Sequence, residues 1–365
     1  MTQHTPPKKP KKQAIIGGVD THADTHHAAV TLTNGGRIAD TEFPTTQAGY
    51  QQLVAWMSEF GRLRSVGVEG TGSYRAGLSR HLCGLGVPVV EVNRPDRRQR
   101  RPKGKSDPLD AYAAADTVRA SGDTTTRALP KAGTAIVEAI RVLHTVRASA
   151  IKARTATMNQ LRALLVTAPA GLRDQLRELS PTALIGTCAR RRPGRQPADP
   201  QHATRYALRA LARRYQTLAT EITTVEDQLH PLVRQACPAL LDIHGVGYET
   251  AAQLLITIGD NPDRIHTEAA FAALCGVAPI PASSGKTHRH RLSRGGDRQA
   301  NRALYLIVCS RLASDPATRA YRDRRRTQGL SNPEIIRCLK RYLTRQIYKT
   351  LTSTNTHQKD PASAA

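Results

Sequence analysis

The chain is poor in aromatic and acidic residues. Its 365 residues include one Trp and three Phe, and 29 Asp and Glu stand against 54 Lys and Arg, a formal net charge of +25. The core must therefore be built from Ala, Leu, Val and Ile, which favours helices that pack through small residues. Net charge of this size indicates the partners rather than the fold. Nucleic acid is the expected partner, because each phosphate that a cation neutralises releases condensed counterions.

Paired cysteines and long apolar runs are also missing. The six cysteines are scattered, with no Cys-x-x-Cys pair, which argues against a disulfide framework and a structural zinc site. No apolar stretch is long enough to span a bilayer, and no signal peptide is recognisable. We expect a cytoplasmic, nucleoid-associated protein of a prokaryote with no membrane partner.

The first part of the chain alternates between predicted strands and helices. Three strands come first, and Asn34-Gly35-Gly36 forms a hairpin turn between the second and third. Helices and further strands then alternate up to a closing helix over Asp107 to Ala120. This is the order of a ribonuclease-H-like α/β fold, although a fold alone does not prove a function.

The rest of the chain is predicted to be all-α. Apolar residues from Leu208 to Leu229 recur at spacings of three and four, which is typical of a coiled-coil seam. We expect Pro231 to end that helix. The seam fits a hairpin within the chain and a dimer equally well. The predicted parts are a disordered basic arm (1–13), an α/β catalytic domain (14–125), a helical coiled-coil region (126–235), a C-terminal domain (236–352) and a disordered tail (353–365).

Four carboxylates form the first candidate site. Asp20 ends the first predicted strand and Glu69 the fourth, while Asp107 and Asp110 open the closing helix. Neighbouring strand ends would bring the first two together, and a spacing of three places the other two on one helix face. Crowded carboxylates repel one another and need cations, and oxygen ligands suit Mg²⁺ or Mn²⁺. Such ions can activate the attacking oxygen and stabilise the leaving one in phosphodiester chemistry.

Each acid also has a simpler interpretation. Asp107 would cap its helix and Glu69 would pair with an arginine, but the four together, in this order, favour a metal site. Nearby His22, Asp24 and His26 are interpreted as solvated loop and strand-start residues rather than as ligands.

Gly245 and Gly247 frame a Gly-Val-Gly turn between two short predicted helices. The pattern resembles a helix-hairpin-helix, in which glycines let backbone N–H groups approach a DNA phosphate. A tight turn within a helical domain is the alternative.

Ser283 and Ser284 precede a glycine in a strongly basic loop. Its cations would stabilise charge that builds on phosphorus oxygens, although Ser-Gly loops are common and usually inert. No activating base is recognisable beside the serines. We predict nucleic-acid contacts from this loop and from the basic stretch before Asp107, at Arg97, Arg98, Arg100, Arg101, Lys105, Lys286, Arg289, Arg291 and Arg294.

These motifs together resemble the DEDD transposases of the IS110 insertion-sequence family. The N-terminal blocks are Gly18-Val19-Asp20-Thr21-His22, Val68-Glu69-Gly70-Thr71-Gly72 and Lys105-Ser106-Asp107-Pro108-Leu109-Asp110-Ala111. The C-terminal blocks are Ile243-His244-Gly245-Val246-Gly247, Gly276-Val277-Ala278-Pro279, Ser284-Gly285 and Gly296-Asp297.

The resemblance implies more than the residues show by themselves. It implies a RuvC-like N-terminal domain that binds divalent metal through the acidic tetrad, and a C-terminal serine that forms a phosphoserine link to DNA. By motif position that serine is Ser284, with Ser283 as its rival. It also implies homodimers or homotetramers, and guidance by a structured noncoding bridge RNA.

Two other functions stay open from the sequence. A metal-dependent resolvase-like endonuclease would need the four acids but not the serine. A basic nucleic-acid-binding protein without chemistry would explain the charge, but not four acids gathered in so basic a chain.

Overall fold

The computed structural model describes residues 13–69, 73–92, 106–120, 131, 136–192, 198–261, 264–283 and 290–359. The chain divides into two compact units. The first comprises Met1–Ala135 and Ile258–Ala270, and the second Ile136–Thr257 and Phe271–Ala365. All six cysteines are free. No helix in the described part of the chain is long and apolar enough to cross a membrane.

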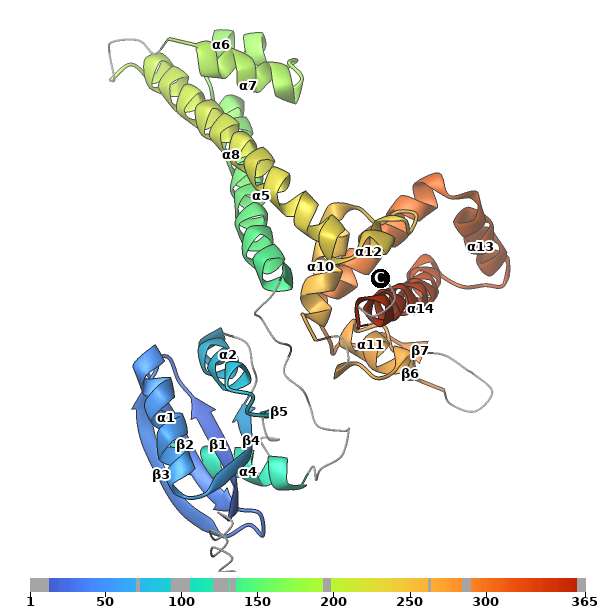
Figure 1. Cartoon of the computed structure of the whole chain (residues 1–365). Coiled ribbons are helices and arrows are strands. Elements are labelled where there is room, and N and C mark those ends of the chain that lie inside the picture. The colour runs from blue at the N-terminus through green and yellow to red at the C-terminus, as the bar shows by residue number, and fades with distance from the viewer. Residues whose placement is uncertain are drawn as a thin grey trace, which may run out of the picture. The chain divides into compact units, whose positions relative to one another are not determined.

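The first unit contains a five-stranded mixed sheet in the order β3-β2-β1-β4-β5 (Figure 1). Strands β1 (Ala14–Thr21), β2 (Thr25–Leu32) and β3 (Arg37–Pro44) form an antiparallel meander. Strands β4 (Arg62–Glu69) and β5 (Val89–Val92) extend it, with β4 parallel to β1 and β5 parallel to β4. The predicted succession of strands along the chain is therefore confirmed.

Helices cover both faces of this sheet. Alternate residues of a strand face opposite sides, so Ile15 and Ile16 of β1 belong to different apolar clusters. The cluster around Ile15 includes residues of α1 and α2, and the cluster around Ile16 includes residues of the last helix, α4. Among the described residues up to Ala120, the helical elements are α1 (Gln47–Glu59), η1 (Ser73–Arg75), α2 (Ala76–Gly84) and α4 (Asp107–Ala120).

Helix α4 lies unusually close to the sheet because glycines face it. A Cβ atom added at Gly18 of β1 would lie 2.1 Å from the carbonyl oxygen of Ala111. One added at Gly67 of β4 would lie 2.5 Å from that of Ala114. The helix backbone thus rests directly on β1 and β4, which determines where its first turn lies.

Two long helices dominate the second unit. Helices α5 (Ile136–Val166) and α8 (Pro200–Ala236) pack side by side as a long helical hairpin (Figure 1). The shorter α6 (Ala170–Leu176) and α7 (Pro181–Arg190) connect them and share an apolar cluster with both. Of the two arrangements open from the sequence, the structure shows α8 packed against α5 of the same chain.

Helix α8 does not end where the sequence predicted. It passes through Pro231 and continues to Ala236, so the predicted end at Pro231 is wrong. A proline inside a helix removes one backbone hydrogen bond and crowds the preceding turn. Here Leu229 and Val233 are both fully buried on either side of it, and that packing holds the helix together beyond the proline.

The described residues after α8 form short helices, one small hairpin and three longer helices. Asp297 and Asp315 cap two of these helices through side-chain bonds to backbone N–H groups. The elements are α9 (Pro238–Leu241), α10 (Tyr248–Ile258), α11 (Glu268–Leu274), β6 (Ile280–Pro281), β7 (His290–Arg291), α12 (Arg298–Ser314), α13 (Pro316–Thr327) and α14 (Asn332–Lys359).

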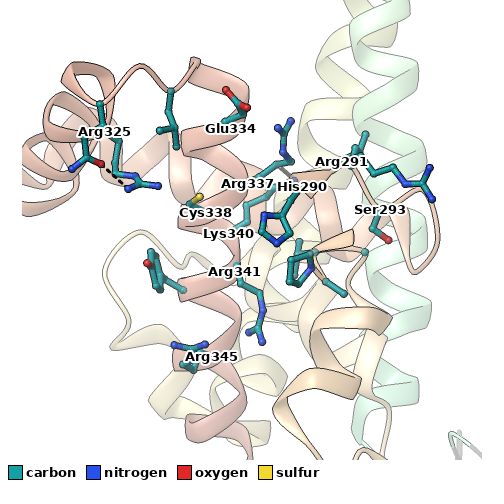
Figure 2. A pocket seen from close by; sticks show the side chains of 18 of the residues that line it. His290, Arg291, Ser293, Arg325, Glu334, Arg337, Cys338, Lys340, Arg341 and Arg345 are labelled. Atoms are coloured by element: carbon teal, nitrogen blue, oxygen red, sulfur yellow. Dashed lines mark hydrogen bonds between the residues drawn. The ribbon is translucent and has the colours of Figure 1, made fainter. Parts of the chain in front are cut away.

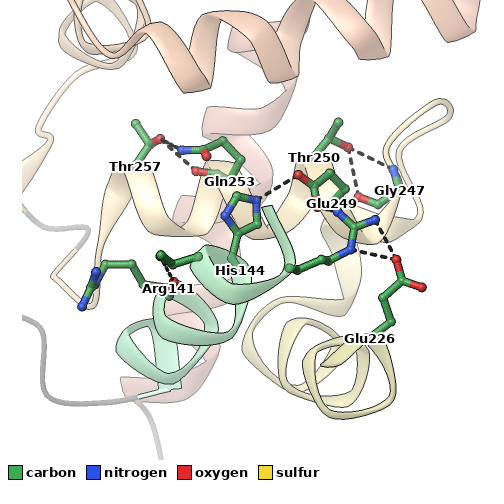
Figure 3. Close-up of polar contacts among 10 residues, drawn as sticks. Arg141, His144, Glu226, Gly247, Glu249, Thr250, Gln253 and Thr257 are labelled. Carbon is green, nitrogen blue, oxygen red and sulfur yellow. Dashed lines mark hydrogen bonds and ion pairs between the residues drawn. The ribbon is translucent and has the colours of Figure 1, made fainter. Parts of the chain in front are cut away.

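A polar network joins the long helical pair to α10 (Figure 3). His144 Nε2 of α5 lies 3.0 Å from Glu249 Oε1 of α10. Arg147 of α5 forms ion pairs with the same Glu249 and with Glu226 of α8, the latter at 2.7 Å. Both α5 side chains are largely buried, so this network fixes how α10 meets the helical pair.

Candidate active site

Asp20 and Glu69 lie side by side at one edge of the sheet. Val19 of β1 pairs with Val68 of the parallel strand β4, so the next residue of each strand is a carboxylate. Asp20 is 4% exposed and Glu69 is 7% exposed. The structure thus brings the two acids together as the order of strands predicted.

Asp107 and Asp110 complete the acidic cluster from the first turn of α4. His22 Nε2 lies 3.3 Å from Asp20 Oδ2 and 3.3 Å from Asp107 Oδ1. One ligand atom from each of these three residues lies within 4.8 Å of the others. Asp110 is near enough to act electrostatically on Asp20. All four predicted acids therefore gather where β1 and β4 end.

The electrostatics of Asp20 suit a bound cation. Burial raises the pKa of Asp20, His22 opposes that shift, and the charges of Glu69 and Asp110 raise the pKa further. Its Oδ2 atom is buried and accepts no hydrogen bond among the described residues. A divalent cation would offset this repulsion, and carboxylate oxygens are ligands that Mg²⁺ and Mn²⁺ prefer. The residues present therefore fit such an ion.

The histidines near Asp20 differ from their predicted roles. His22 is exposed to 41%, but its ring lies between two carboxylates rather than only in solvent. His26 is fully buried and stacks on Tyr50, with ring centroids 5.6 Å apart, so its interpretation as a solvated residue is wrong. Asp24 is exposed. The turn from β1 to β2 directs His22 back over the strand end, which residue spacing does not reveal.

Most of the other predicted site residues fall outside the described part of the chain. These are Ser284, Lys286, Arg289, Arg97, Arg98, Arg100, Arg101 and Lys105. The rival serine, Ser283, is described and exposed just after β6, and Arg291 and Arg294 are exposed at and after β7. Their roles in nucleic-acid binding stay predictions.

The Gly-Val-Gly turn connects α9 to α10. Gly245 has a φ of +82°, a left-handed conformation that favours glycine. A Cβ atom there would lie 3.2 Å from the carbonyl oxygen of Ile307 in α12. Gly247 is exposed, and its N–H donates to Thr250 Oγ1 at 3.1 Å. Phosphate binding at Gly247 would have to compete with that bond.

Two family models match the chain in order. Residues 17–168 match a model of DEDD transposases, and residues 237–323 match one described as a transposase of the IS116/IS110/IS902 family. The first match spans the sheet and the acidic cluster, and the second spans α9 to α13. Together these matches identify the class of the protein, the transposases.

Curated relatives agree with this class. The 43.6 kDa protein of insertion element IS110 from Streptomyces coelicolor is 36% identical over 130 residues, 33% of this chain and 32% of that protein. The 42 kDa protein of insertion element IS900 from Mycobacterium paratuberculosis is 24% identical over 90% of this chain and 93% of its own length. The transposase of element IS1328 from Yersinia enterocolitica is 27% identical, covering 64% and 66%.

The chain belongs to the IS110 family of insertion-sequence transposases. Its match to the Streptomyces protein spans about a third of that relative, whereas its match to the Mycobacterium protein spans nearly all of it.

Proposed function

We propose that this chain cuts and rejoins DNA as the transposase of an insertion sequence, with a divalent cation and a serine nucleophile. The observation that carries the proposal is the gathering of Asp20, Glu69, Asp107 and Asp110 at the ends of β1 and β4 and the start of α4, in a chain of net charge +25. Four clustered carboxylates would weaken phosphate binding unless a cation neutralised them. The strand order supports a ribonuclease-H-like, RuvC-like domain.

The four carboxylates would hold Mg²⁺ or Mn²⁺. When bound, such an ion supplies charge stabilisation for the attacking and leaving oxygens of phosphodiester transfer. Asp20 and Glu69 come from rigid strands, and Asp107 and Asp110 come from a helix that rests on those strands. The site therefore has little freedom to rearrange, as electrostatic catalysis requires.

Ser284 is the proposed nucleophile, by its position in the family motif. Its hydroxyl oxygen forms a bond to phosphorus as the bond from phosphorus to a DNA oxygen breaks. The serine proton leaves to solvent, and the released DNA oxygen takes a proton. A second DNA hydroxyl then attacks the phosphoserine and loses its proton, and the serine oxygen leaves phosphorus and takes up a proton. One phosphodiester thus replaces another without an external energy source.

The proposed partners are DNA, a structured noncoding guide RNA and further copies of the same chain. The charge of the chain and the exposed Arg291 and Arg294 support nucleic-acid binding. The proposed domains are those of the sequence analysis, with residues 14–125 as the catalytic domain and 236–352 as the serine-bearing domain with its helix-hairpin-helix-like turn at Gly245 and Gly247.

The test is strand transfer in vitro with Mg²⁺, RNA transcribed from the sequence flanking the element, and supercoiled DNA. Denaturing gels would detect protein joined covalently to DNA. Ser284→Ala would be compared with its neighbour Ser283→Ala. Asp20→Asn would be compared with Asp116→Asn, an acid further along α4 that pairs with Arg119.

The proposal expects an adduct that only Ser284→Ala and Asp20→Asn abolish. Loss with Ser283→Ala instead would move the nucleophile by one residue. Cleavage without an adduct, unchanged in both serine variants, would identify a hydrolytic endonuclease. Binding without cleavage, unchanged or strengthened in Asp20→Asn, would identify a nucleic-acid-binding protein without chemistry.

A further inference from the structure

A strongly basic cavity lies in the second unit, and none of its described lining residues belongs to the acidic cluster. It has a volume of about 650 Å³ and is lined by Gly276 to Pro279, β7, the end of α13 and one face of α14 (Figure 2). Its described lining contains one carboxylate, Glu334, which accepts hydrogen bonds from the N–H and hydroxyl of Ser331. Six cations line the same cavity: Arg291, Arg325, Arg337, Lys340, Arg341 and Arg345.

Three of these cations form a row on α14. Arg337, Arg341 and Arg345 are spaced four residues apart, so they lie one above another on a single helix face, where like charges destabilise a helix. Burial and the neighbouring Arg345 lower the pKa of Arg341. A bound anion would offset the repulsion among these three cations.

Lys340 is the most buried cation of the cavity. The residue is 6% exposed, and its ammonium donates to Asn301 Oδ1 at 2.8 Å. The amide of Asn301 is held in turn by the carbonyl oxygens of Cys275 and Gly276, at 3.0 and 2.9 Å. An ammonium has three N–H groups. One hydrogen bond to a neutral amide uses one of them and does not neutralise the positive charge.

No carboxylate in the described part of the chain forms an ion pair with Lys340 or with Arg337. Burial and the charge of Arg337 lower the pKa of Lys340, as expected for a buried cation without a counter-charge. Such burial is costly unless an anion is bound.

We propose that this cavity binds a backbone phosphate of nucleic acid, with Lys340 as its anchor and Arg337 and Arg341 as the cations beside it. The inference rests on the proposed function in one respect, namely that a transposase meets DNA and RNA. A phosphodiester presents two charged oxygens, which ammonium and guanidinium donors arranged around one cavity can bind together. Phosphate contacts position a protein on nucleic acid without reading its sequence.

The experiment measures binding by the full-length protein without divalent metal, so that no strand is cut. Fluorescence anisotropy gives the Kd of a labelled DNA duplex, a labelled DNA strand and a labelled RNA strand over a series of salt concentrations. The variants are Lys340→Met and, at the half-exposed rim, Arg337→Gln. The control is Lys349→Met, which removes the same charge from an exposed position of α14 outside the cavity.

Loss of a charge-assisted hydrogen bond is expected to weaken binding by about tenfold or more. The slope of log Kd against log salt concentration should also become shallower than in the control, by the amount that corresponds to about one phosphate contact. Weaker binding of DNA alone, of RNA alone or of both by the pocket variants supports the proposal and identifies which polymer the cavity binds. Pocket variants that bind all three probes like Lys349→Met overturn the proposal.

Circular dichroism shows whether each variant is folded, and if Lys340→Met is not, Arg337→Gln decides alone. The result is separable from the proposed function. A protein that forms the serine adduct but whose pocket variants bind like the control refutes only the pocket. Weakened pocket variants of a protein that never forms an adduct refute only the serine chemistry.

Discussion

Gly18 lies in the middle of β1, where helix α4 crosses the strand. Replacement by alanine would place a methyl group 2.1 Å from the Ala111 carbonyl oxygen and also against the backbone of Ala115. Because backbone cannot move aside as a side chain can, we expect Gly18→Ala to displace α4. Overpacking of this kind costs about 1–3 kcal/mol or more, and displacement carries Asp107 and Asp110 away from Asp20. Chemical denaturation and isothermal titration with Mn²⁺ measure the two losses.

Gly84→Ala is the matched control, because nothing lies within 4 Å of a Cβ at that position in α2. It should leave metal binding unchanged and alter the free energy of unfolding by less than about 1 kcal/mol. Equal stability and equal Mn²⁺ affinity of the Gly18→Ala and Gly84→Ala proteins would contradict the steric argument.

Replacement of Asp20 should change how the stability of the protein depends on divalent metal. The Asp20 carboxylate is buried, and the charges of Glu69 and Asp110 oppose its ionisation. In EDTA, Asp20→Asn should therefore be no less stable than the native protein, because the change removes a buried repulsive charge. Addition of Mg²⁺ or Mn²⁺ should raise the melting temperature of the native protein but not of the variant. A variant that gains as much as the native protein would exclude Asp20 as a ligand.

At the scale of elements, Glu249 connects α10 to α5. Burial alone would raise the pKa of Glu249, but the hydrogen bond from His144 and the charges of His144, Arg147 and Arg302 lower it below its ordinary value of 4.5. The resulting stabilisation is fully present above that ordinary value and is lost as pH falls through the lower pKa of the folded protein. The stability of the second unit should therefore decline below about pH 4.5.

Glu249→Gln tests this connection. The side chain is 41% exposed, so solvent screens the pair and we expect a loss of about 1 kcal/mol at neutral pH. Glu178→Gln, which removes an 81% exposed partner of Arg177, should cost almost nothing. Urea unfolding at several pH values would show the variant losing less stability on acidification than the native chain. Parallel pH profiles would argue against the network.

The secondary structure was predictable where local signals and packing agree. The first two predicted strands contain the buried Ile15, Val19 and Val30, and α4 begins and ends at the predicted residues, Asp107 and Ala120. The end of α8 was not predictable, because tertiary packing around Pro231 overrides its local effect.

The candidate site was predictable only in part, for a similar reason. Strand order alone places Asp20 beside Glu69. The close approach of α4 depends on pairing Gly18 with Ala111 across the fold, and the turn that directs His22 between two carboxylates is a matter of backbone geometry. The basic cavity joins residues from four separate segments, which no local pattern connects.

At the scale of the whole molecule, the chain passes between its two units three times. It leaves the first unit after Ala135, returns at Ile258 and leaves again after Ala270. Within the first unit Arg264 is largely buried and acts electrostatically with Glu91, and Gly259 approaches Lys131 closely.

A single proteolytic cut between Ala135 and Ile136 should therefore leave both fragments associated, because the second fragment still carries residues 258–270 of the first unit. We expect one peak on native size-exclusion chromatography and two bands in denaturing gels. Separation of the fragments under native conditions would show that this returning segment contributes little to the first unit.

The same discontinuity sets an order for synthesis. Domains made of one continuous segment can fold as soon as that segment leaves the ribosome. The four acids of the cluster are all translated by Asp110, but the last part of their unit is translated only with residue 270, after the whole helical pair. The unit that gathers the acids is therefore finished late in translation, and a messenger cut short before residue 258 would encode every proposed metal ligand without the segment that completes their unit.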